Sequence, residues 1–306
     1  MDAHFPACRV RFLMSTSRSG GECVWSHYYL SMSWLDTTIW TLAVWEILIL
    51  AGVGLIAGLL GGLLGIGGGI VNVPAITLLL SRDIHLAQAA SMNVTVFVAI
   101  PAAIRHWKLG GIRKEAVVRI VPFGIVGVLL GVTASIWIIN DWLMWIFGLF
   151  LVYVFWTNLR QLLKDNKKSI GDEPPESCCT RARCGVVGSL AGFGGGLLGI
   201  GGGLITVPLT QLICRIPLRQ CIAISSTVMI FTALAGATYK DITLPDVPGI
   251  AADITWYTPL EISIWLIPTC LIGSWTGAKL THVWPLKIVR SVFLVLVAVA
   301  AIRMLA

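Results

Sequence analysis

The sequence predicts an all-α, polytopic membrane protein of about ten hydrophobic segments, arranged as two inverted five-segment repeats with broken helices at glycine clusters. Three observations predict this class: an apolar composition, a series of apolar runs of helical length, and a glycine-rich motif that occurs twice. Hydrophobic residues make up 57% of the chain and charged residues 12%, whereas soluble proteins carry about 25% charged residues. The chain therefore lacks the polar side chains that a water-exposed surface needs, and it leaves little room for a separate catalytic domain.

Apolar runs follow one another from residue 39 onward, with short connections between them. A helix needs roughly 20 apolar residues to cross the hydrocarbon core, so 306 residues allow about ten spans. The predicted segments are residues 39–60, 66–80, 86–104, 116–139, 142–163, 185–200, 204–213, 221–239, 260–280 and 286–305. Several of these segments are shorter than a full crossing requires.

One charged, proline-containing stretch interrupts the apolar runs and divides the chain into two halves. It predicts a cytoplasmic linker at residues 164–184, between a first transmembrane repeat at residues 39–163 and a second at residues 185–306. Residues 1–38 form a polar leader without the apolar core of a signal peptide. We expect residues 1–31 of this leader to be a disordered arm or to precede the true start of translation at Met32.

The eight cysteines lack the paired spacing of a secreted disulfide framework. Cys178, Cys179 and Cys184 form the one cluster, in the predicted linker. A soft metal or a redox sensor is one interpretation of this cluster, but no histidine lies nearby to complete a ligand set. We favour reduced cytoplasmic cysteines, and we expect no metal site and no cofactor.

A glycine-rich motif occurs once in each half. Residues 61–74 read GGLLGIGGGIVNVP and residues 195–208 read GGLLGIGGGLITVP, a separation of 134 positions (195 − 61 = 134). Beyond the motif the match weakens, and we align residues 91–95 with residues 223–227 after a two-residue slip. Self-similarity over this length indicates an internal duplication.

Lys and Arg are distributed in opposite senses over equivalent loops of the two halves. The loop after the third segment carries several basic residues between Arg105 and Arg119, whereas Lys240 is the basic residue of the loop after the eighth. Because basic residues collect in cytoplasmic loops, this pattern predicts inverted copies with both termini outside and the linker inside. The net charge of +7 is therefore a topology signal, and no nucleic-acid partner is expected.

The glycine clusters predict helix breaks within the membrane. Each glycine costs about 1 kcal/mol relative to alanine in a helix and proline costs about 3 kcal/mol, so GIGGG followed by proline is poor continuous helix. Irregular backbone inside a bilayer survives where protein buries it or water reaches it, as at the substrate site of a transporter. A helix that restarts after glycines presents free N–H groups and its positive dipole end, which favours an anion.

The candidate substrate-binding residues are the glycines, the prolines that follow them, and nearby polar side chains that offer amide or hydroxyl groups. They are Gly65, Gly67, Gly68, Gly69, Asn72, Pro74, Asn93, Thr95, Gly199, Gly201, Gly202, Gly203, Thr206, Pro208, Gln211, Ser225, Ser226 and Thr227. A Ser or Thr in a membrane helix is often bonded to its own backbone instead. Close helix packing is the other interpretation of glycine, and we prefer it for three pairs: Gly54/Gly58, Gly127/Gly131 and Gly273/Gly277.

Few ionisable residues fall inside the predicted spans, namely Glu46, His106 and Glu261. An ionisable residue within the membrane suggests a proton relay or a gate. Most of these residues lie close enough to predicted segment ends to reach the interface, so we leave open whether they form a relay or gate or are interfacial side chains. No nucleophile or metal-ligand constellation is present at catalytic spacing, and we predict that the chain is not an enzyme.

The duplicated motif resembles the signature of the sulfite exporter TauE/SafE family of membrane permeases. The regions around Ala90-Ser91 and Ser225-Ser226 and the loop of residues 105–112 share the resemblance, which covers about residues 40–306. The resemblance implies a secondary transporter of the plasma (inner) membrane, without a bound cofactor, for sulfur-containing anions such as sulfite, thiosulfate or sulfoacetate.

Two functions of different classes follow. The first is a permease for small anions that alternates access around a site at the membrane midplane. The second is a membrane scaffold or assembly factor that transports nothing and binds a partner through its basic linker. The expected partners of the permease are the anion and the lipid bilayer.

Overall fold

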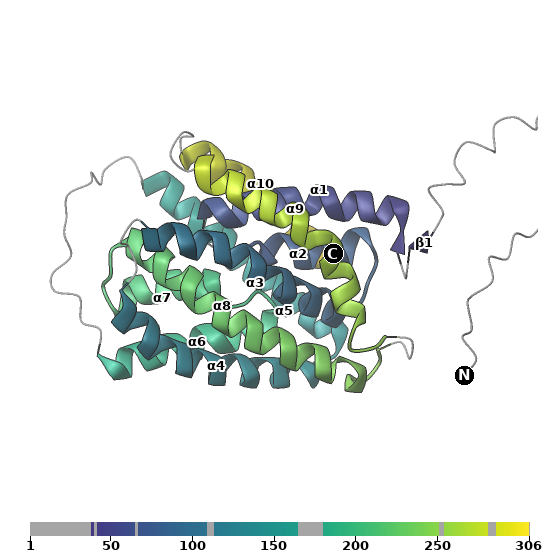
Figure 1. Cartoon of the computed structure of the whole chain (residues 1–306), viewed down its shortest axis with the longest axis horizontal. Coiled ribbons are helices and arrows are strands. Elements are labelled where there is room, and N and C mark those ends of the chain that lie inside the picture. The colour runs from purple at the N-terminus through teal and green to yellow at the C-terminus, as the bar shows by residue number, and fades with distance from the viewer. Residues whose placement is uncertain are drawn as a thin grey trace, which may run out of the picture.

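The structure is a computed structural model in which residues 38–39, 42–64, 67–108, 113–164, 180–250, 254–280 and 286–305 are described. Within these ranges the chain forms ten α-helices, most of which lie along the long axis of the molecule (Figure 1). The predicted number of helical segments is confirmed. Most of the predicted leader and residues 165–179 of the predicted linker lie outside the described ranges.

The first half contains α1 to α5 and the second half α6 to α10. The helices of the first half are α1 (Val44–Leu64), α2 (Gly69–Leu79), α3 (Ile84–Lys108), α4 (Lys114–Ile136) and α5 (Asn140–Lys164). Those of the second half are α6 (Arg181–Leu198), α7 (Gly203–Ile213), α8 (Leu218–Thr243), α9 (Thr258–Leu280) and α10 (Leu286–Leu305), with a short 3-10 helix η1 (Leu244–Asp246) after α8. One antiparallel pair of two-residue strands, β1 (Thr38–Ile39) and β2 (Leu42–Ala43), precedes α1, which the all-α prediction did not include.

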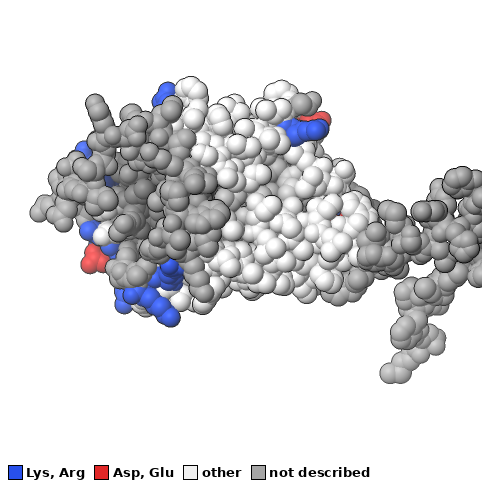
Figure 2. Space-filling view, turned by 90° about the horizontal axis from the view of Figure 1, so that it is seen from above, with Lys and Arg blue, Asp and Glu red and all other residues white. Residues whose placement is uncertain are grey.

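Five helices among the described residues are long and apolar enough to cross a membrane: α1, α3, α4, α5 and α8. By contrast, α2 and α7 have 11 residues each, which is about 16 Å, roughly half of a hydrocarbon core. The face in Figure 2 carries charged side chains at the two ends of the long axis and uncharged residues between them. The protein is therefore a multi-pass membrane protein.

The α1–α9 pair packs with the two helix backbones in contact. A Cβ atom at Gly58 would overlap the carbonyl of Cys270, and one at Gly62 would overlap the carbonyl of Ser274. Contacts that advance by four residues on both helices show that α1 and α9 run in the same direction. Small residues permit this close approach without a side chain between the helices.

The α4–α6 pair has the same construction on the opposite edge of the molecule (Figure 1). A Cβ atom at Gly192 would overlap the carbonyl of Gly124, and one at Gly196 would overlap that of Val128, so α4 and α6 are also parallel. The three glycine pairs assigned to helix packing, Gly54/Gly58, Gly127/Gly131 and Gly273/Gly277, all lie in these two interfaces. The packing interpretation of these glycines is confirmed.

The helices α3 and α8 cross in opposite directions between these two pairs. Lys240 of α8 bonds to His85 at the start of α3, and Gly236 lies against Met92. Two further contacts place α3 parallel to α9: the Ser263 hydroxyl donates to the Ala90 carbonyl, and the Ser274 hydroxyl donates to the Val98 carbonyl.

On the other side, α8 is parallel to α4. A Cβ atom at Gly124 would lie 2.9 Å from the Thr232 side chain, and the Thr133 hydroxyl is 3.2 Å from the Tyr239 hydroxyl. Consequently α1, α3 and α9 run one way along the long axis, and α4, α6 and α8 run the other way.

The same glycine–serine contact occurs once within each half, at equivalent positions of the duplicated motif. A Cβ atom at Gly69 would lie 3.1 Å from the Ser91 hydroxyl, and one at Gly203 would lie 3.5 Å from the Ser225 hydroxyl. Gly203 follows Gly69 by 134 positions and Ser225 follows Ser91 by the same number, so Ser91 corresponds to Ser225. The two-residue slip in the sequence alignment is therefore wrong, because matching Thr95 with Thr227 by identity ignored the helix faces that contact the glycines.

We predict opposite effects for two alanine substitutions in α1. Gly58→Ala introduces a methyl group against the Cys270 backbone, so it should lower the free energy of unfolding by about 1–3 kcal/mol. Gly52→Ala meets nothing within 4 Å and should leave stability unchanged or raise it by up to about 1 kcal/mol. Thermal unfolding of the purified protein, followed by tryptophan fluorescence, measures both, and equal midpoints for the two variants would contradict the packing assignment.

Candidate functional site

Two glycine segments separate short helices from longer ones at the centre of the bundle. The helix α1 ends at Leu64 and α2 begins at Gly69, while α6 ends at Leu198 and α7 begins at Gly203. Glycines in these segments have positive φ angles: 76° at Gly67, 75° at Gly68, 69° at Gly199, 71° at Gly201 and 81° at Gly202. Residues with a Cβ atom rarely adopt this conformation, which explains why the motif requires glycine. Gly65 and Ile66 lie outside the described ranges.

The two glycine segments meet at one point. A Cβ atom on Gly67 would lie 2.9 Å from Thr95 Cγ2 and 2.7 Å from Met229 Sδ. A Cβ atom on Gly201 would lie 2.9 Å from the same Thr95 atom and 3.4 Å from Met229 Cγ. Thr95 and Met229 are each close to the middle of a long helix, α3 with 25 residues and α8 with 26. The segments therefore come together about halfway along the bundle.

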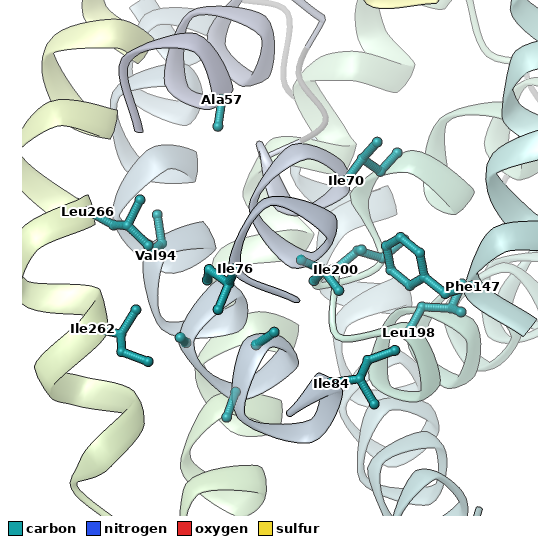
Figure 3. Close-up of a cluster of buried hydrophobic side chains, with 14 of the residues drawn as sticks. Ala57, Ile70, Ile76, Ile84, Val94, Phe147, Leu198, Ile200, Ile262 and Leu266 are labelled. Carbon is teal, nitrogen blue, oxygen red and sulfur yellow. The ribbon is translucent and has the colours of Figure 1, made fainter. Parts of the chain in front are cut away.

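Apolar side chains surround the meeting point. Figure 3 shows Ile200, from the segment between α6 and α7, among Ile70 and Ile76 of α2 and near Phe147 of α5. A Cβ atom on Gly69 would lie 3.0 Å from the Ile200 Cα atom, so the two halves touch directly here. Polar groups in this region are buried away from water by packing from both halves.

The N-termini of α2 and α7 lie at this point without a side-chain cap. Gly68 and Gly202 are their N-cap residues, and neither end has a side-chain cap hydrogen bond. The first N–H groups of a helix have no acceptor within the helix and normally bond to a capping side chain, to water or to a ligand. Two positive dipole ends directed at one place favour an anion there.

Five polar side chains of the first half have buried atoms without a hydrogen-bond partner among the described residues, and three of them belong to this region. Both amide atoms of Asn72 in the first turns of α2, the Ser91 hydroxyl and the Gln88 Oε1 atom are in this state. All three residues are fully buried. A buried polar group that lacks a partner costs about 1–3 kcal/mol, and such groups in native structures often mark a binding site.

These side chains lie against the glycine segments. Ser91 faces Gly69, and Gln88 packs on Gly199 while its Nε2 atom donates to the Leu197 carbonyl at 3.1 Å. The buried Cys270 thiol of α9 lies near the Asn72 amide but makes no hydrogen bond to it. Amide and hydroxyl groups of this kind can donate to an oxyanion without adding a fixed charge.

Hydroxyl groups of both halves instead bond to the backbone of the glycine segments. Thr95 donates to the Gly67 carbonyl at 3.3 Å and to the Ser91 carbonyl at 2.8 Å. Thr232 donates to the Gly201 carbonyl at 2.9 Å. These bonds satisfy carbonyl groups that an apolar interior would otherwise leave exposed at a high cost.

In the second half the equivalents of two of these side chains, Asn72 and Ser91, are themselves bonded. Thr206, which corresponds to Asn72, donates to the Gly202 carbonyl at 2.8 Å. Ser225, which corresponds to Ser91, donates to the Gly203 carbonyl at 2.8 Å. The candidate site is therefore built symmetrically in its backbone but has its unpartnered polar groups on one side.

Other candidate residues lie away from the glycine segments or bond within their own helix. Ser226 and Thr227 bond to carbonyls one turn back in α8, and Gln211 is exposed near the end of α7. Asn93 donates to the Asp241 carboxylate at 2.9 Å. The prolines are inside helices: Pro74 is buried in α2 and Pro208 is half-buried in α7.

Sequence reasoning missed several residues of this region. Gln88, Met229 and Thr232 contact or bond to the glycine segments, and a polar Gln88 in an apolar run was the one available signal. The assignment of Lys240 to a loop was wrong, because α8 continues to Thr243 and buries both Lys240 and the neighbouring Asp241. The apolar run in the sequence ends at Tyr239, whereas the helix α8 continues to Thr243.

Within the described ranges no group of three or more His, Cys, Asp or Glu residues is placed to hold a metal ion. Cys184, Cys214, Cys221 and Cys270 are buried. Cys178 and Cys179, the other members of the predicted cluster, lie outside those ranges.

A helical bundle with uncharged flanks, charged ends and short central helices defines a multi-pass α-helical membrane protein. The chain belongs to the sulfite exporter TauE/SafE family, whose family model matches residues 50–304. No solved structure matches the chain.

Curated relatives are named as transporters. The chain is 27% identical, over 85% of its length, to the probable membrane transporter protein MamO of Magnetospirillum gryphiswaldense, and the match covers 45% of that longer protein. It is 24% identical, over 76% of its length, to the probable membrane transporter protein YunE of Bacillus subtilis, of which 86% is covered. A probable membrane transporter protein of Haemophilus influenzae is 42% identical over 23% of this chain.

We predict that Asn72→Leu stabilises the protein. The amide has no partner to lose within the described part of the chain, so replacing it with an apolar side chain of similar size should raise the free energy of unfolding by about 1 kcal/mol. Thr206→Val at the equivalent position removes a bond to Gly202 and should lower it by about 1 kcal/mol. Thermal unfolding of both variants in the absence of ligand is the measurement, and a destabilised Asn72→Leu variant would show that Asn72 has a structural partner.

Proposed function

We propose that this protein is a secondary transporter for small anions, with sulfur-containing oxyanions or sulfonates such as sulfite, thiosulfate and sulfoacetate as the substrate class. One observation carries the proposal: two uncapped helix N-termini meet at the centre of the bundle, beside buried polar side chains that lack partners. The family name and the names of the relatives support a transporter of this class.

The proposed site replaces the water that an anion loses on entering the membrane. A bare ion in a low-dielectric interior is strongly disfavoured, so transport requires groups that substitute for its hydration shell. The N–H groups of α2 and α7, the Asn72 amide and the Ser91 hydroxyl would donate to the oxygen atoms of the anion. All of these donors are uncharged, which keeps binding weak enough for release.

We also propose that the two halves are inverted copies that rock around this site. Three observations support it: α1 and α6 run in opposite directions, equivalent glycines make equivalent contacts, and both glycine segments touch Thr95 and Met229. In inverted-repeat transporters, movement of one half against the other exposes a fixed central site to each side in turn. In this chain the crossing of α3 and α8 joins the halves, so it would rearrange during each cycle.

The proposed location is the plasma (inner) membrane, with the linker on the cytoplasmic side. Arg105, Lys114 and Arg181 lie at the end of the bundle where α3 ends and α4 and α6 begin. Arg82 and Arg303 lie at the other end. An excess of basic residues marks the cytoplasmic end.

Transport across a defined bilayer tests the function. Purified protein in liposomes should move labelled sulfite or thiosulfate, and Gly201→Ala should reduce uptake by about tenfold or more, because alanine at a φ of 71° and 2.9 Å from Thr95 distorts the site. Gly52→Ala, which meets nothing within 4 Å, is the matched control and should transport as the wild type does. Sulfoacetate, sulfate and chloride measured alongside define the substrate class.

Two results would overturn the proposal. Liposomes with folded wild-type protein that remain impermeable to all of these anions would favour the scaffold interpretation. Normal transport by Gly201→Ala would show that the site lies elsewhere.

Reporter fusions test the orientation. A fluorescent protein inserted in the linker should fluoresce, since it folds in the cytoplasm, and a phosphatase fused after residue 306 should be active outside. The reverse pattern would invert the assignment without affecting the site.

A further inference from the structure

A second cluster of buried polar residues lies between α3, α4 and α8, away from the glycine segments. Its centre is Lys240, which is fully buried. The Lys240 ammonium donates to the Ser135 hydroxyl at 2.7 Å and lies 3.0 Å from the His85 Nδ1 atom. Lys240 is 11 positions beyond Met229 in α8, which is about 16 Å along the helix. The cluster is therefore distinct from the proposed substrate site.

Next to this lysine, Asp241 is buried with an incomplete set of partners. Its side chain is 7% exposed, its Oδ2 atom accepts from the Asn93 amide at 2.9 Å, and its Oδ1 atom is buried with no partner among the described residues. The salt bridges found among the described residues are Arg82–Glu46 and Arg119–Glu115, and neither of them includes Asp241.

The charged and titratable groups around Asp241 come from each neighbouring element. On α8 itself Lys240 turns to Ser135 of α4 and His85 of α3, and the charge that acts on it is that of Asp83, just before α3. Asp83 in turn accepts from the His85 backbone at 2.8 Å and from the Asn140 amide at 2.6 Å. Asp246 of η1 is exposed. Lys240 bonds to Ser135, lies next to His85 and is in neither salt bridge of the described residues, while Asn93 is the polar group that faces Asp241 from α3.

This arrangement determines which form of Asp241 the closed bundle stabilises. An ionised carboxylate without a cation costs several kcal/mol when water is removed, whereas the neutral acid does not. When water reaches the same group, the ionised form is favoured again. A carboxyl that alternates between these two surroundings takes up a proton in one and releases it in the other.

Asp241 lies where a change in the α3–α8 interface would alter its access to water. Asn93, its partner, is two residues from both Ser91 and Thr95 in α3, so this helix connects the carboxyl to the substrate site. The bonds from Lys240 to His85 and from Asn93 to Asp241 both cross the α3–α8 interface, which joins the two halves. Opening this end of the interface would break both bonds and hydrate the carboxyl.

The first half has no equivalent cluster. The positions 134 residues before Lys240 and Asp241 are His106 and Trp107, which are half-buried and exposed. Glu46, one of the predicted candidates for a proton relay, also differs from Asp241, since it pairs with Arg82 at 3.4 Å. One end of an otherwise symmetric scaffold therefore carries the ionisable group.

We propose that Asp241 is the proton-binding site through which this transporter couples anion movement to a proton gradient. The inference rests on the proposed transport function. The Asp241 carboxylate binds one proton from the aqueous phase when the α3–α8 interface is open at its end, and the neutral acid is enclosed when the interface closes. Release of that proton when water next reaches the group restores the carboxylate, so no other reactant is needed.

Proteoliposomes that contain a pH-sensitive dye and labelled thiosulfate test this role. With the wild type, an imposed pH gradient should drive accumulation of thiosulfate, and thiosulfate movement should change the internal pH. Asp241→Asn holds the side chain in a neutral form of the same shape, so it should lose gradient-driven accumulation by about tenfold or more while its exchange of labelled for unlabelled thiosulfate stays within about threefold of the wild type.

Two further variants complete the test. Asp246→Asn removes an exposed carboxylate five residues away and should accumulate thiosulfate as the wild type does. Asp241→Glu keeps a titratable group and should retain part of the gradient-driven accumulation, which also shows that the position tolerates substitution.

The outcomes separate this inference from the proposed function. A wild-type protein that transports no anion contradicts the proposed function. A wild-type protein that transports thiosulfate without any proton movement overturns the role of Asp241. The same conclusion follows if Asp241→Asn accumulates thiosulfate normally, or if it loses exchange together with accumulation.

Discussion

The structure depends on one constraint: two stretches of irregular backbone must be satisfied inside an apolar bundle. Positive φ angles at Gly67, Gly68, Gly201 and Gly202 turn the chain between helices, and no side chain could occupy the space that these glycines leave. The Thr95 and Thr232 hydroxyls satisfy carbonyl groups of the two segments, while the N-termini of α2 and α7 remain uncapped. The parallel glycine-packed pairs and the crossing of α3 with α8 hold these segments against one another.

Symmetry in the backbone coexists with asymmetry in the side chains. Equivalent glycines make equivalent contacts in both halves, yet Ser225 bonds to the Gly203 carbonyl while the Ser91 hydroxyl has no partner among the described residues. A duplicated scaffold supplies the same geometry twice, because helix packing depends on small residues at fixed spacing. The two copies therefore share their backbone packing and differ in the bonding of their polar side chains.

Sequence patterns predicted the ten helical segments and the glycines that permit close packing. Both depend on local features, namely apolar runs of sufficient length and small residues four positions apart. The end of α8 was predicted wrongly because composition changes at Tyr239, whereas the helix continues to Thr243 and buries Lys240 and Asp241 against α3 and α4. The buried Lys240 is stabilised by Ser135 and His85, which are more than 100 positions away in the sequence, so no local pattern predicts these contacts.

The sequence by itself determined that the chain is a multi-pass helical membrane protein with a duplicated glycine motif, since hydropathy, helix length and glycine content are properties of contiguous residues. Only the tertiary structure decided which polar side chains have partners. Asn93 bonds to Asp241 across 148 positions, and Gln88 bonds to Leu197 across 109. Hydrogen bonds between residues so far apart exist because two halves of the chain fold against each other, and that arrangement decides where a polar group remains available to bind.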